Sequence, residues 1–487
     1  MSPKNYETVP SIETSAANNA PDEFGRREVL RRILVAWIFG ATWQSITTGA
    51  TLTRYAKSLH VTEFGFGILA AIPFIAAFAQ LPASFLVERY GHRKRVFLVA
   101  NLIHRVLWLV IAAIPWLVSV DQRPLGLITL MLVSSLSQHT TAPAWYSWLS
   151  DIVPTRIRGR YLSRRTQAGQ IVSLVLTVAV GVALDWAEGV SGLALSRVLS
   201  LLLAVAAVCG LADILFFVRI PDHGGYEKNQ HYGWKNLFVE PLRNRSFRRY
   251  LGFTAMMTFS IGYVGQFSWL YAFDVANMSN VQANFLLMTC PMVLAMFGVS
   301  FWGRMIDRLG RKPVAMIATA FVIQGGVLWI VIREGSVMPA YLGILVAAFA
   351  WPGVDLASYN ILLGLVRQEK GGGRNTAYVA LNSVVVATAG TASGLFGGVL
   401  ASWLKDWRGD FLGLPMTYHC ILFLMSMFFR FFALLCLRGI EDPRAFTARQ
   451  AISYMAADMH SNIQNALMVP VRLAGRWSYK VRMKDEC

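Results

Sequence analysis

The sequence predicts an all-α membrane protein, with twelve transmembrane helices in two pseudo-symmetric six-helix bundles. Three observations support this fold class. Apolar stretches of roughly 20 residues, the length that crosses a bilayer as a helix, recur along nearly the whole chain. The loops between them alternate between basic and poorly charged. A short basic-acidic pattern also occurs twice, 219 residues apart, and repeats of this kind indicate two similar halves.

The composition excludes several classes of protein. Of the 487 residues, 55 % are hydrophobic and 15 % charged, and the mean hydropathy of +0.46 is too high for a soluble domain. The net charge of +18 lies in loops beside apolar stretches, so we expect basic cytoplasmic loops and no nucleic-acid partner. The five cysteines show no metal-ligand spacing, so we predict no metal site.

The order of the helices follows from the apolar stretches. Twelve spans are predicted, at 32–53, 64–87, 96–119, 125–150, 167–186, 193–218, 249–273, 281–302, 314–332, 338–365, 376–402 and 412–437. Of the 45 Lys and Arg residues, 36 fall on the side of the loops that also holds both termini, seven fall on the other side and two lie within spans. The positive-inside rule therefore predicts that both termini are cytoplasmic.

The predicted spans divide the chain into five segments. They are a disordered cytoplasmic tail at 1–30, an N-terminal six-helix bundle at 31–219, a central cytoplasmic loop at 220–248, a C-terminal six-helix bundle at 249–438 and a basic cytoplasmic tail at 439–487. The last tail contains an amphipathic stretch at 451–476. This stretch is compatible with a helix on the membrane surface and equally with a poorly ordered tail.

The repeated pattern joins spans 2 and 3 and, again, spans 8 and 9. The second copy contains Gly303, Asp307, Arg308, Gly310, Arg311 and Lys312. The first copy contains Glu88, Arg89, Gly91 and Arg93, with Ser84 in place of the leading glycine and His92 in place of an arginine. With six plus six spans and a long central loop, this pattern resembles the major facilitator superfamily over about residues 30–438. The resemblance implies a transporter that works by alternating access.

The repeated pattern has a physical interpretation as a cytoplasmic gate. Its glycine allows two helices to approach closely, and its acid lies beside guanidinium groups that can bind it with two hydrogen bonds. Such a cluster can join the halves in one state and separate in another. Asp151, at the cytoplasmic end of span 4, is expected to pair with loop arginines. The alternative is that these loops serve only to set topology.

The resemblance also implies that spans 1, 4, 7 and 10 line a central cavity. Polar or aromatic residues near the middle of these spans are then the candidates for binding substrate or protons: Trp43, Gln44, Gln138, His139, Gln266, Asp355 and Tyr359. Asp355 is the strongest candidate, because a charge near the membrane midplane costs about 2.5–3.5 kcal/mol on insertion scales. A structural role remains the alternative for Asp355 and, more so, for His139.

Four further ionisable residues lie in predicted spans. His104 and Arg105 in span 3 are expected to make structural hydrogen bonds away from the cavity. Asp213 and Arg430 lie near the cytoplasmic ends of their spans, where snorkelling to the interface would satisfy them.

Several absences narrow the function. No P-loop pattern is present, which argues against ATP-driven transport. Span 5 has no Gly-Pro pair of the kind that drug–proton antiporters of this family carry, which argues against multidrug efflux. No soluble segment holds a catalytic constellation, so we expect no enzyme and no cofactor.

We therefore predict a secondary active transporter of a small-molecule substrate, with proton coupling as a hypothesis. The alternatives are an uncoupled facilitator and a non-transporting receptor or scaffold. We expect a monomer that spans the lipid bilayer of the inner or plasma membrane many times.

Overall fold

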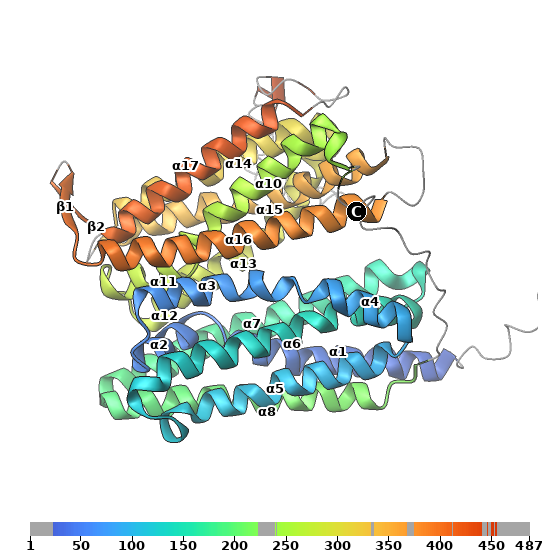
Figure 1. Cartoon of the computed structure of the whole chain (residues 1–487), viewed down its shortest axis with the longest axis horizontal. Coiled ribbons are helices and arrows are strands. Elements are labelled where there is room, and N and C mark those ends of the chain that lie inside the picture. The colour runs from blue at the N-terminus through green and yellow to red at the C-terminus, as the bar shows by residue number, and fades with distance from the viewer. Residues whose placement is uncertain are drawn as a thin grey trace, which may run out of the picture.

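The structure of the protein is a computed structural model. It describes residues 23–222, 239, 241–332, 336–367, 375–411, 413–440, 446, 450, 451, 453 and 454. Two helical bundles lie side by side, one built from α1 to α8 and the other from α10 to α17 (Figure 1). We call them the N-half and the C-half. The predicted amphipathic stretch at 451–476 lies almost wholly outside the described residues.

The N-half contains the first six predicted spans. Its helices are α1 (Glu23–Ile46), α2 (Ala50–Ser58), α3 (Glu63–Ala77), α4 (Gln80–Tyr90), α5 (Arg93–Leu117), α6 (Arg123–Ile152), α7 (Thr155–Val190) and α8 (Gly192–Val218), with a 3-10 turn at Val120–Gln122. Spans 1 and 2 are each split. Gly49, with φ +66°, separates α1 from α2. Pro82 lies in the first turn of α4, where its missing N–H and its ring disfavour a continuous helix from α3.

The C-half contains the other six spans. Its helices are α10 (Arg245–Gly262), α11 (Gly265–Asp274), α12 (Asn280–Asn284), α13 (Cys290–Leu309), α14 (Arg311–Ile330), α15 (Met338–Arg367), α16 (Asn375–Leu404) and α17 (Tyr418–Arg438), with a 3-10 turn at Pro241–Arg243 and a π-helical turn at Phe285–Thr289. Thus span 7 is divided into α10 and α11, and span 8 changes helix type close to its start.

The start of the last span differs from its prediction. Strand β1 (Arg408–Phe411) pairs antiparallel with β2 (Leu414–Thr417), and α17 begins only at Tyr418 rather than at residue 412. The hairpin forms because Gly413 adopts φ +75° in the turn, a conformation that favours glycine. This hairpin projects at one end of the molecule (Figure 1). We call that end the hairpin end. The opposite end, which holds Gly91 and Gly310, is the motif end.

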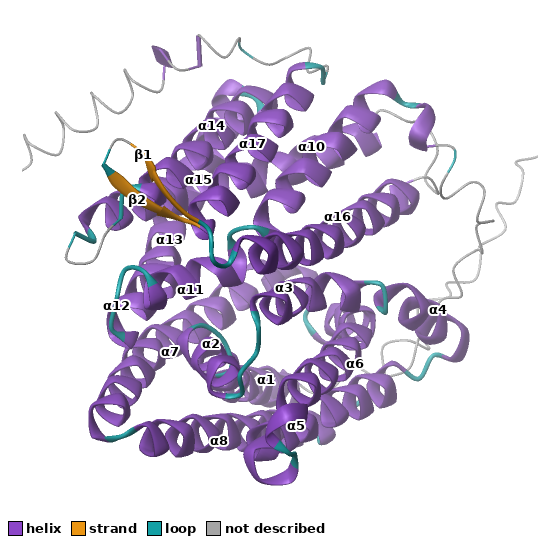
Figure 2. Cartoon of the chain, turned by 60° about the vertical axis from the view of Figure 1, so that its left-hand side comes forward, coloured by secondary structure: helices purple, strands orange, loops and turns teal. Residues whose placement is uncertain are grey.

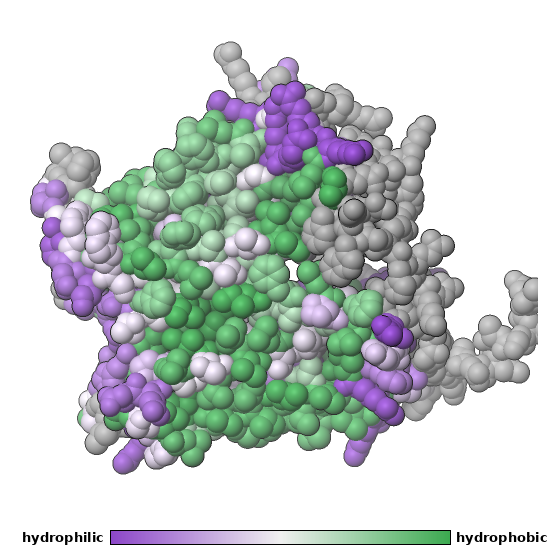
Figure 3. All heavy atoms as spheres, in the orientation of Figure 1, coloured by the Kyte–Doolittle hydropathy of each residue, from purple (hydrophilic) through white to green (hydrophobic). Residues whose placement is uncertain are grey.

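The surface has the polarity of a membrane protein. A broad hydrophobic band covers both halves in the view of Figure 3, and hydrophilic residues lie at the two ends. Among the described residues, nine helices are long and apolar enough to cross a membrane. The other three predicted spans are 1, 4 and 7. Span 7 is interrupted, and the middle of span 4 is polar over 134–141. Three of the four spans implied to line a cavity are therefore those that fall short of a continuous apolar helix.

The hydrophobic core is shared at one end of the molecule and divided at the other. One buried cluster contains residues of both halves, such as Tyr55 and Trp108 with Phe267 and Tyr271. Two further clusters belong to one half each and lie toward the motif end. Helices α3 and α16 run side by side between the halves (Figures 1 and 2). They approach so closely that a Cβ atom on Gly67 would come within 2.3 Å of the Gly398 Cα atom.

The two copies of the repeated pattern adopt the same local structure. Gly91 and Gly310 both have positive φ, +65° and +93°, and each ends a helix. The lysine that follows then reaches the last turn of its half. Lys94 Nζ donates to Val218 O at 3.0 Å, and Lys312 Nζ donates to Arg438 O at 2.9 Å. The internal symmetry thus extends to individual hydrogen bonds that tie spans 3 and 9 to the ends of spans 6 and 12.

Candidate functional site

The hairpin end joins the two halves through polar contacts, which we call the seam. The Asp185 carboxylate at the end of α7 accepts hydrogen bonds from the first turn of α12. Asn280 N and Nδ2 lie 2.6 and 2.8 Å from Asp185 Oδ1, and Val281 N lies 3.1 Å from Oδ2. Asn280 is completely buried. A carboxylate at a helix N-terminus is favoured by the free N–H groups and by the helix dipole.

Cationic side chains of the N-half complete the seam. Arg54 Nε donates to Asn280 Oδ1 at 2.9 Å, and its guanidinium lies 4.0 Å from the centre of the Phe273 ring. Arg54 also pairs with Glu188 in its own half at 3.2 Å. Lys57 forms an ion pair with Asp274 across the halves. The seam is thus a continuous network of hydrogen bonds and opposite charges.

The motif end has a different pattern of contacts. Buried Arg93 pairs with Asp151 of α6 at 2.5 Å and with Asp222, just beyond the end of α8, at 3.0 Å. Neither ion pair reaches the C-half. Arg311 donates to Asn360 O at 3.0 Å within the C-half. Every hydrogen bond and ion pair that the structure gives between described residues of the two halves lies at the hairpin end. Between described residues, the polar contacts that join the two halves therefore lie at the hairpin end.

The first copy of the motif is described in part. Arg89 is exposed, and the side chain of Glu88 lies outside the described part of the chain. In the second copy, Asp307 is exposed and has no hydrogen bond or salt bridge with another described residue. Arg308 donates to Tyr454 Oη at 3.1 Å, and Gly303 has open space beside it.

The interior of the N-half holds a buried ion pair. Arg105 Nη2 lies 3.3 Å from Asp213 Oδ2, and the two side chains are 7 % and 13 % exposed. The Arg105 guanidinium lies 3.7 Å from the centre of the Trp43 ring, and Trp43 packs edge-on against His104. His104 Nδ1 is 2.7 Å from Ser134 Oγ. Trp43 therefore belongs to a buried polar cluster in the N-half.

The expected snorkelling of Asp213 and Arg430 is wrong. Asp213 is held by Arg105 across the bundle. Arg430 is 7 % exposed, and it donates from Nε to Ser260 Oγ at 3.2 Å and from Nη1 to Val322 O at 3.0 Å. Both residues find partners inside their half, so neither has to extend to the interface. The interior position of Arg430 was missed, although a lone arginine within the aromatic run 428–432 was a signal for it.

A cavity of about 620 Å³ lies inside the C-half and carries two charged groups. Asp355 from α15 and Arg430 from α17 both line it, together with Ser268 from α11 and the indoles of Trp329 and Trp351. Asp355 is 12 residues from the end of α15, or about 18 Å along the helix. Neither Asp355 nor Arg430 has a salt-bridge partner among the described residues. An apolar cavity with separate acidic and basic groups is suited to bind and orient a small polar molecule.

The other predicted residues do not line this cavity. Gln44 is exposed on α1, and Gln266 is half-buried at the start of α11. Gln138 and His139 are half-buried on α6, and His139 Nδ1 lies 2.9 Å from Ser135 O of the same helix. Tyr359 is exposed, one turn beyond Asp355. The structure therefore brings Asp355 together with Arg430 and keeps it apart from His139.

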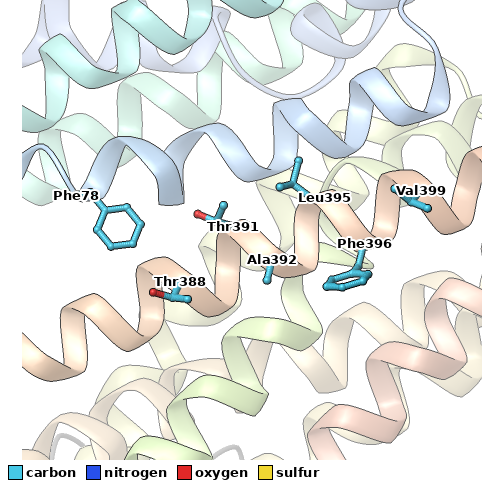
Figure 4. A pocket seen from close by; sticks show the side chains of 7 residues that line it. All are labelled: Phe78, Thr388, Thr391, Ala392, Leu395, Phe396 and Val399. Carbon is cyan, nitrogen blue, oxygen red and sulfur yellow. The ribbon is translucent and has the colours of Figure 1, made fainter.

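A second hollow provides a contrast. It has a volume of about 430 Å³ and lies along α16 beside Phe78 (Figure 4). Its lining is apolar apart from the hydroxyls of Thr388 and Thr391, and no charged side chain takes part. No group of His, Cys, Asp or Glu within the described residues is arranged to hold a metal ion. The cavity with Asp355 and Arg430 is therefore the better candidate site.

Comparisons with known proteins agree on one family. The sequence profile of the Major Facilitator Superfamily matches residues 33–390. No curated protein matches the chain in sequence. Among solved structures, a mutant of the nucleoside transporter NupG has a TM-score of 0.66 at 14 % identity, with 85 % of this chain and 100 % of that chain covered. A D-xylose–proton symporter has a TM-score of 0.60 at 13 % identity, with 85 % and 97 % covered. A bacterial homologue of the iron transporter ferroportin in an inward-facing state has a TM-score of 0.65 at 12 % identity, with 85 % and 98 % covered.

Proposed function

Because the chain belongs to the Major Facilitator Superfamily, and is therefore a membrane transporter and not an enzyme, we propose that it moves a small polar solute by secondary active transport with alternating access. The likeness in fold to a nucleoside transporter and to a D-xylose–proton symporter supports a small polar substrate. The substrate site in this proposal is the cavity that Asp355 and Arg430 line.

The observation that carries this proposal is the unequal joining of the two halves. The seam closes the hairpin end through Asp185 and Asn280. At the motif end, the ion pair of Arg93 with Asp151 and the hydrogen bond of Arg311 to Asn360 O each join described residues of a single half. The charge distribution of the loops favours a cytoplasmic motif end with both termini on that side. On this orientation the protein is in its inward-facing state. Transport then requires the seam to open as the motif end closes.

Proton coupling through Asp355 is the second part of the proposal. A carboxylate without a salt bridge on the wall of a substrate cavity can take up or lose a proton as the cavity changes access. Asp355 has no salt bridge among the described residues, and Arg430 lies in the wall of the same cavity. Release of a proton would leave a negative charge that Arg430 or a bound solute can compensate.

The test begins with ligand identification. A thermal-shift screen of the purified protein against nucleosides, pentoses and other small polar solutes finds binders, since binding raises the melting temperature. Flux of the strongest binder is then measured in liposomes with and without an imposed pH gradient. We expect the wild-type protein to concentrate the solute. We expect Asp355→Asn to bind and exchange it but to lose accumulation by at least about tenfold.

Each other outcome selects a different function. Accumulation by Asp355→Asn would show that this residue is not the proton carrier. Equilibration by the wild-type protein, without response to the pH gradient, would identify an uncoupled facilitator. Binding without flux of any binder would identify a receptor or scaffold.

A further inference from the structure

A groove at the motif end lies outside the substrate cavity and combines basic and apolar side chains. It has a volume of about 780 Å³ and lies between α1 and α8. Its polar wall contains Glu28, Arg31, Arg32 and Arg219, and its apolar wall contains Val35, Ala212, Leu215, Phe216 and Val218. Every lining residue belongs to the N-half, and none takes part in the seam or in the cavity with Asp355.

The groove opens onto the hydrophobic outer surface. Residues along α8 recur every three or four positions on one face: Leu201, Val205, Val208, Ala212, Leu215 and Arg219. The large apolar side chains of this face are well exposed, with Leu201 at 63 % and Leu215 at 68 %. An apolar stripe of this kind on a membrane-spanning helix faces lipid. Arg219 therefore stands where the lipid-facing stripe of α8 ends at the membrane surface.

The charges of the groove favour an anion. Arg32 Nε pairs with Glu28 Oε1 at 3.0 Å, which neutralises that acid. Within the described part of the chain, Arg31 and Arg219 have no salt-bridge partner. Lys94 adds a third cation beside the rim, where its Nζ donates to Val218 O. Arginine guanidinium groups bind phosphate oxygens with two parallel hydrogen bonds, so two free arginines above an apolar floor match a phosphate that carries acyl chains.

From this arrangement we propose that the groove between α1 and α8 binds one anionic phospholipid of the leaflet at the motif end. Arg31 and Arg219 hold the headgroup phosphate, and an acyl chain lies along Leu215 and Val208. A soluble phosphate compound would use the arginines but leave the apolar wall without a partner. The proposal does not depend on the transported solute or on proton coupling.

The test uses the full-length protein in nanodiscs of phosphatidylcholine, with or without added phosphatidylglycerol. We expect phosphatidylglycerol to raise the melting temperature of the wild-type protein, and native mass spectrometry to detect one retained molecule. The double variant Arg31→Gln/Arg219→Gln should bind it at least about tenfold more weakly. The control Arg164→Gln/Arg245→Gln removes two exposed arginines elsewhere at the motif end and should change binding less than twofold.

Two further measurements separate the sources of binding. Ala212→Trp fills the apolar floor without altering charge, and it should weaken phosphatidylglycerol binding while the melting temperature in pure phosphatidylcholine stays unchanged. Inorganic phosphate at millimolar concentration should not stabilise the wild-type protein. If Arg31→Gln/Arg219→Gln and Arg164→Gln/Arg245→Gln weakened phosphatidylglycerol binding equally, the proposed site would be overturned. The lipid would then be attracted by the overall charge of the motif end. Equal stabilisation by inorganic phosphate would overturn the lipid as its occupant.

Discussion

The two halves share one fold, yet the charged residues within their spans find different surroundings. In the N-half, Arg105 of span 3 and Asp213 of span 6 form an ion pair under the Trp43 ring. In the C-half, Arg430 of span 12 bonds to the span 9 backbone at Val322 O and forms no salt bridge with a described residue. Asp355, which is exposed, lies on span 10 and lines a cavity with Arg430.

This difference separates a structural role from a functional one. A neutralised ion pair with aromatic cover is fixed, because removal of either partner leaves a buried charge alone. Two separate charges on the wall of a cavity are available to a ligand or a proton. On the proposed function, the N-half would act as the rigid partner and the C-half as the binding partner in the transport cycle.

The largest expected effect comes from breaking the Arg105–Asp213 ion pair of the N-half. Asp213→Ala leaves Arg105 buried without its carboxylate, and this should cost about 3–5 kcal/mol of stability. The double variant Arg105→Met/Asp213→Leu removes both charges and should recover most of that loss. The loss and its recovery are measured as melting temperatures of the purified wild-type protein, the single variant and the double variant. Equal destabilisation of the single and double variants would mean that packing, and not charge, governs this site.

The matching change in the C-half should affect binding more than folding. Arg430→Met loses two hydrogen bonds, each worth about 0.5–1.5 kcal/mol, but leaves no acid unpaired. We expect a smaller fall in melting temperature than for Asp213→Ala, together with at least about tenfold weaker solute binding. Arg438→Met at the end of the same helix is the control. Unchanged binding in Arg430→Met would remove Arg430 from the proposed site.

A third change addresses the seam between the halves. Asp185→Ala leaves the backbone N–H groups of Asn280 and Val281 without their acceptor, which should cost about 1–3 kcal/mol in the closed seam. Because about 1.4 kcal/mol is a tenfold change in an equilibrium, the population should shift strongly toward a state open at the hairpin end. Spin labels at positions 121 and 405 report the separation of the halves. The control Asp410→Ala removes an acid that bonds within its own hairpin.

An unchanged distance distribution in Asp185→Ala, with the control also unchanged, would contradict the role of the seam. A shift of equal size in both variants would show that the labels respond to local changes in the loops.

The smallest expected effect compares the two copies of the repeated pattern. Asp307→Ala should lower flux a few-fold at normal protein level, because it removes the acid of the complete copy. Glu88→Ala should have the same effect or a weaker one, since its copy departs from the pattern. Flux per folded molecule is the measurement, and Arg304→Gln is a control for charge in the same loop. Normal flux in both variants would show that the loops act only in topology.

Much of the fold could be predicted because its signals are local. Apolar stretches predicted twelve spans, and among the described residues nine helices are long and apolar enough to cross a membrane. The repeat at Gly91 and Gly310 pointed to the family that the sequence profile confirms. The start of span 12 was predicted too early, because an apolar count does not detect a hairpin around Gly413. The residues that share the candidate site were harder to predict from the sequence. Asp355 could be found as an acid within an apolar stretch, but no periodicity indicates which neighbour faces it.

The sequence by itself therefore determined the membrane class and the two-half architecture, and it singled out Asp355 as a candidate. These features depend on the length, polarity and spacing of residues along the chain. Only the tertiary structure decided that Arg430 and not His139 shares a cavity with Asp355, that Trp43 covers a buried ion pair, and that Asp185 caps α12 across the halves. Such contacts depend on the rotation and packing of helices that are distant in sequence, and no local pattern encodes them.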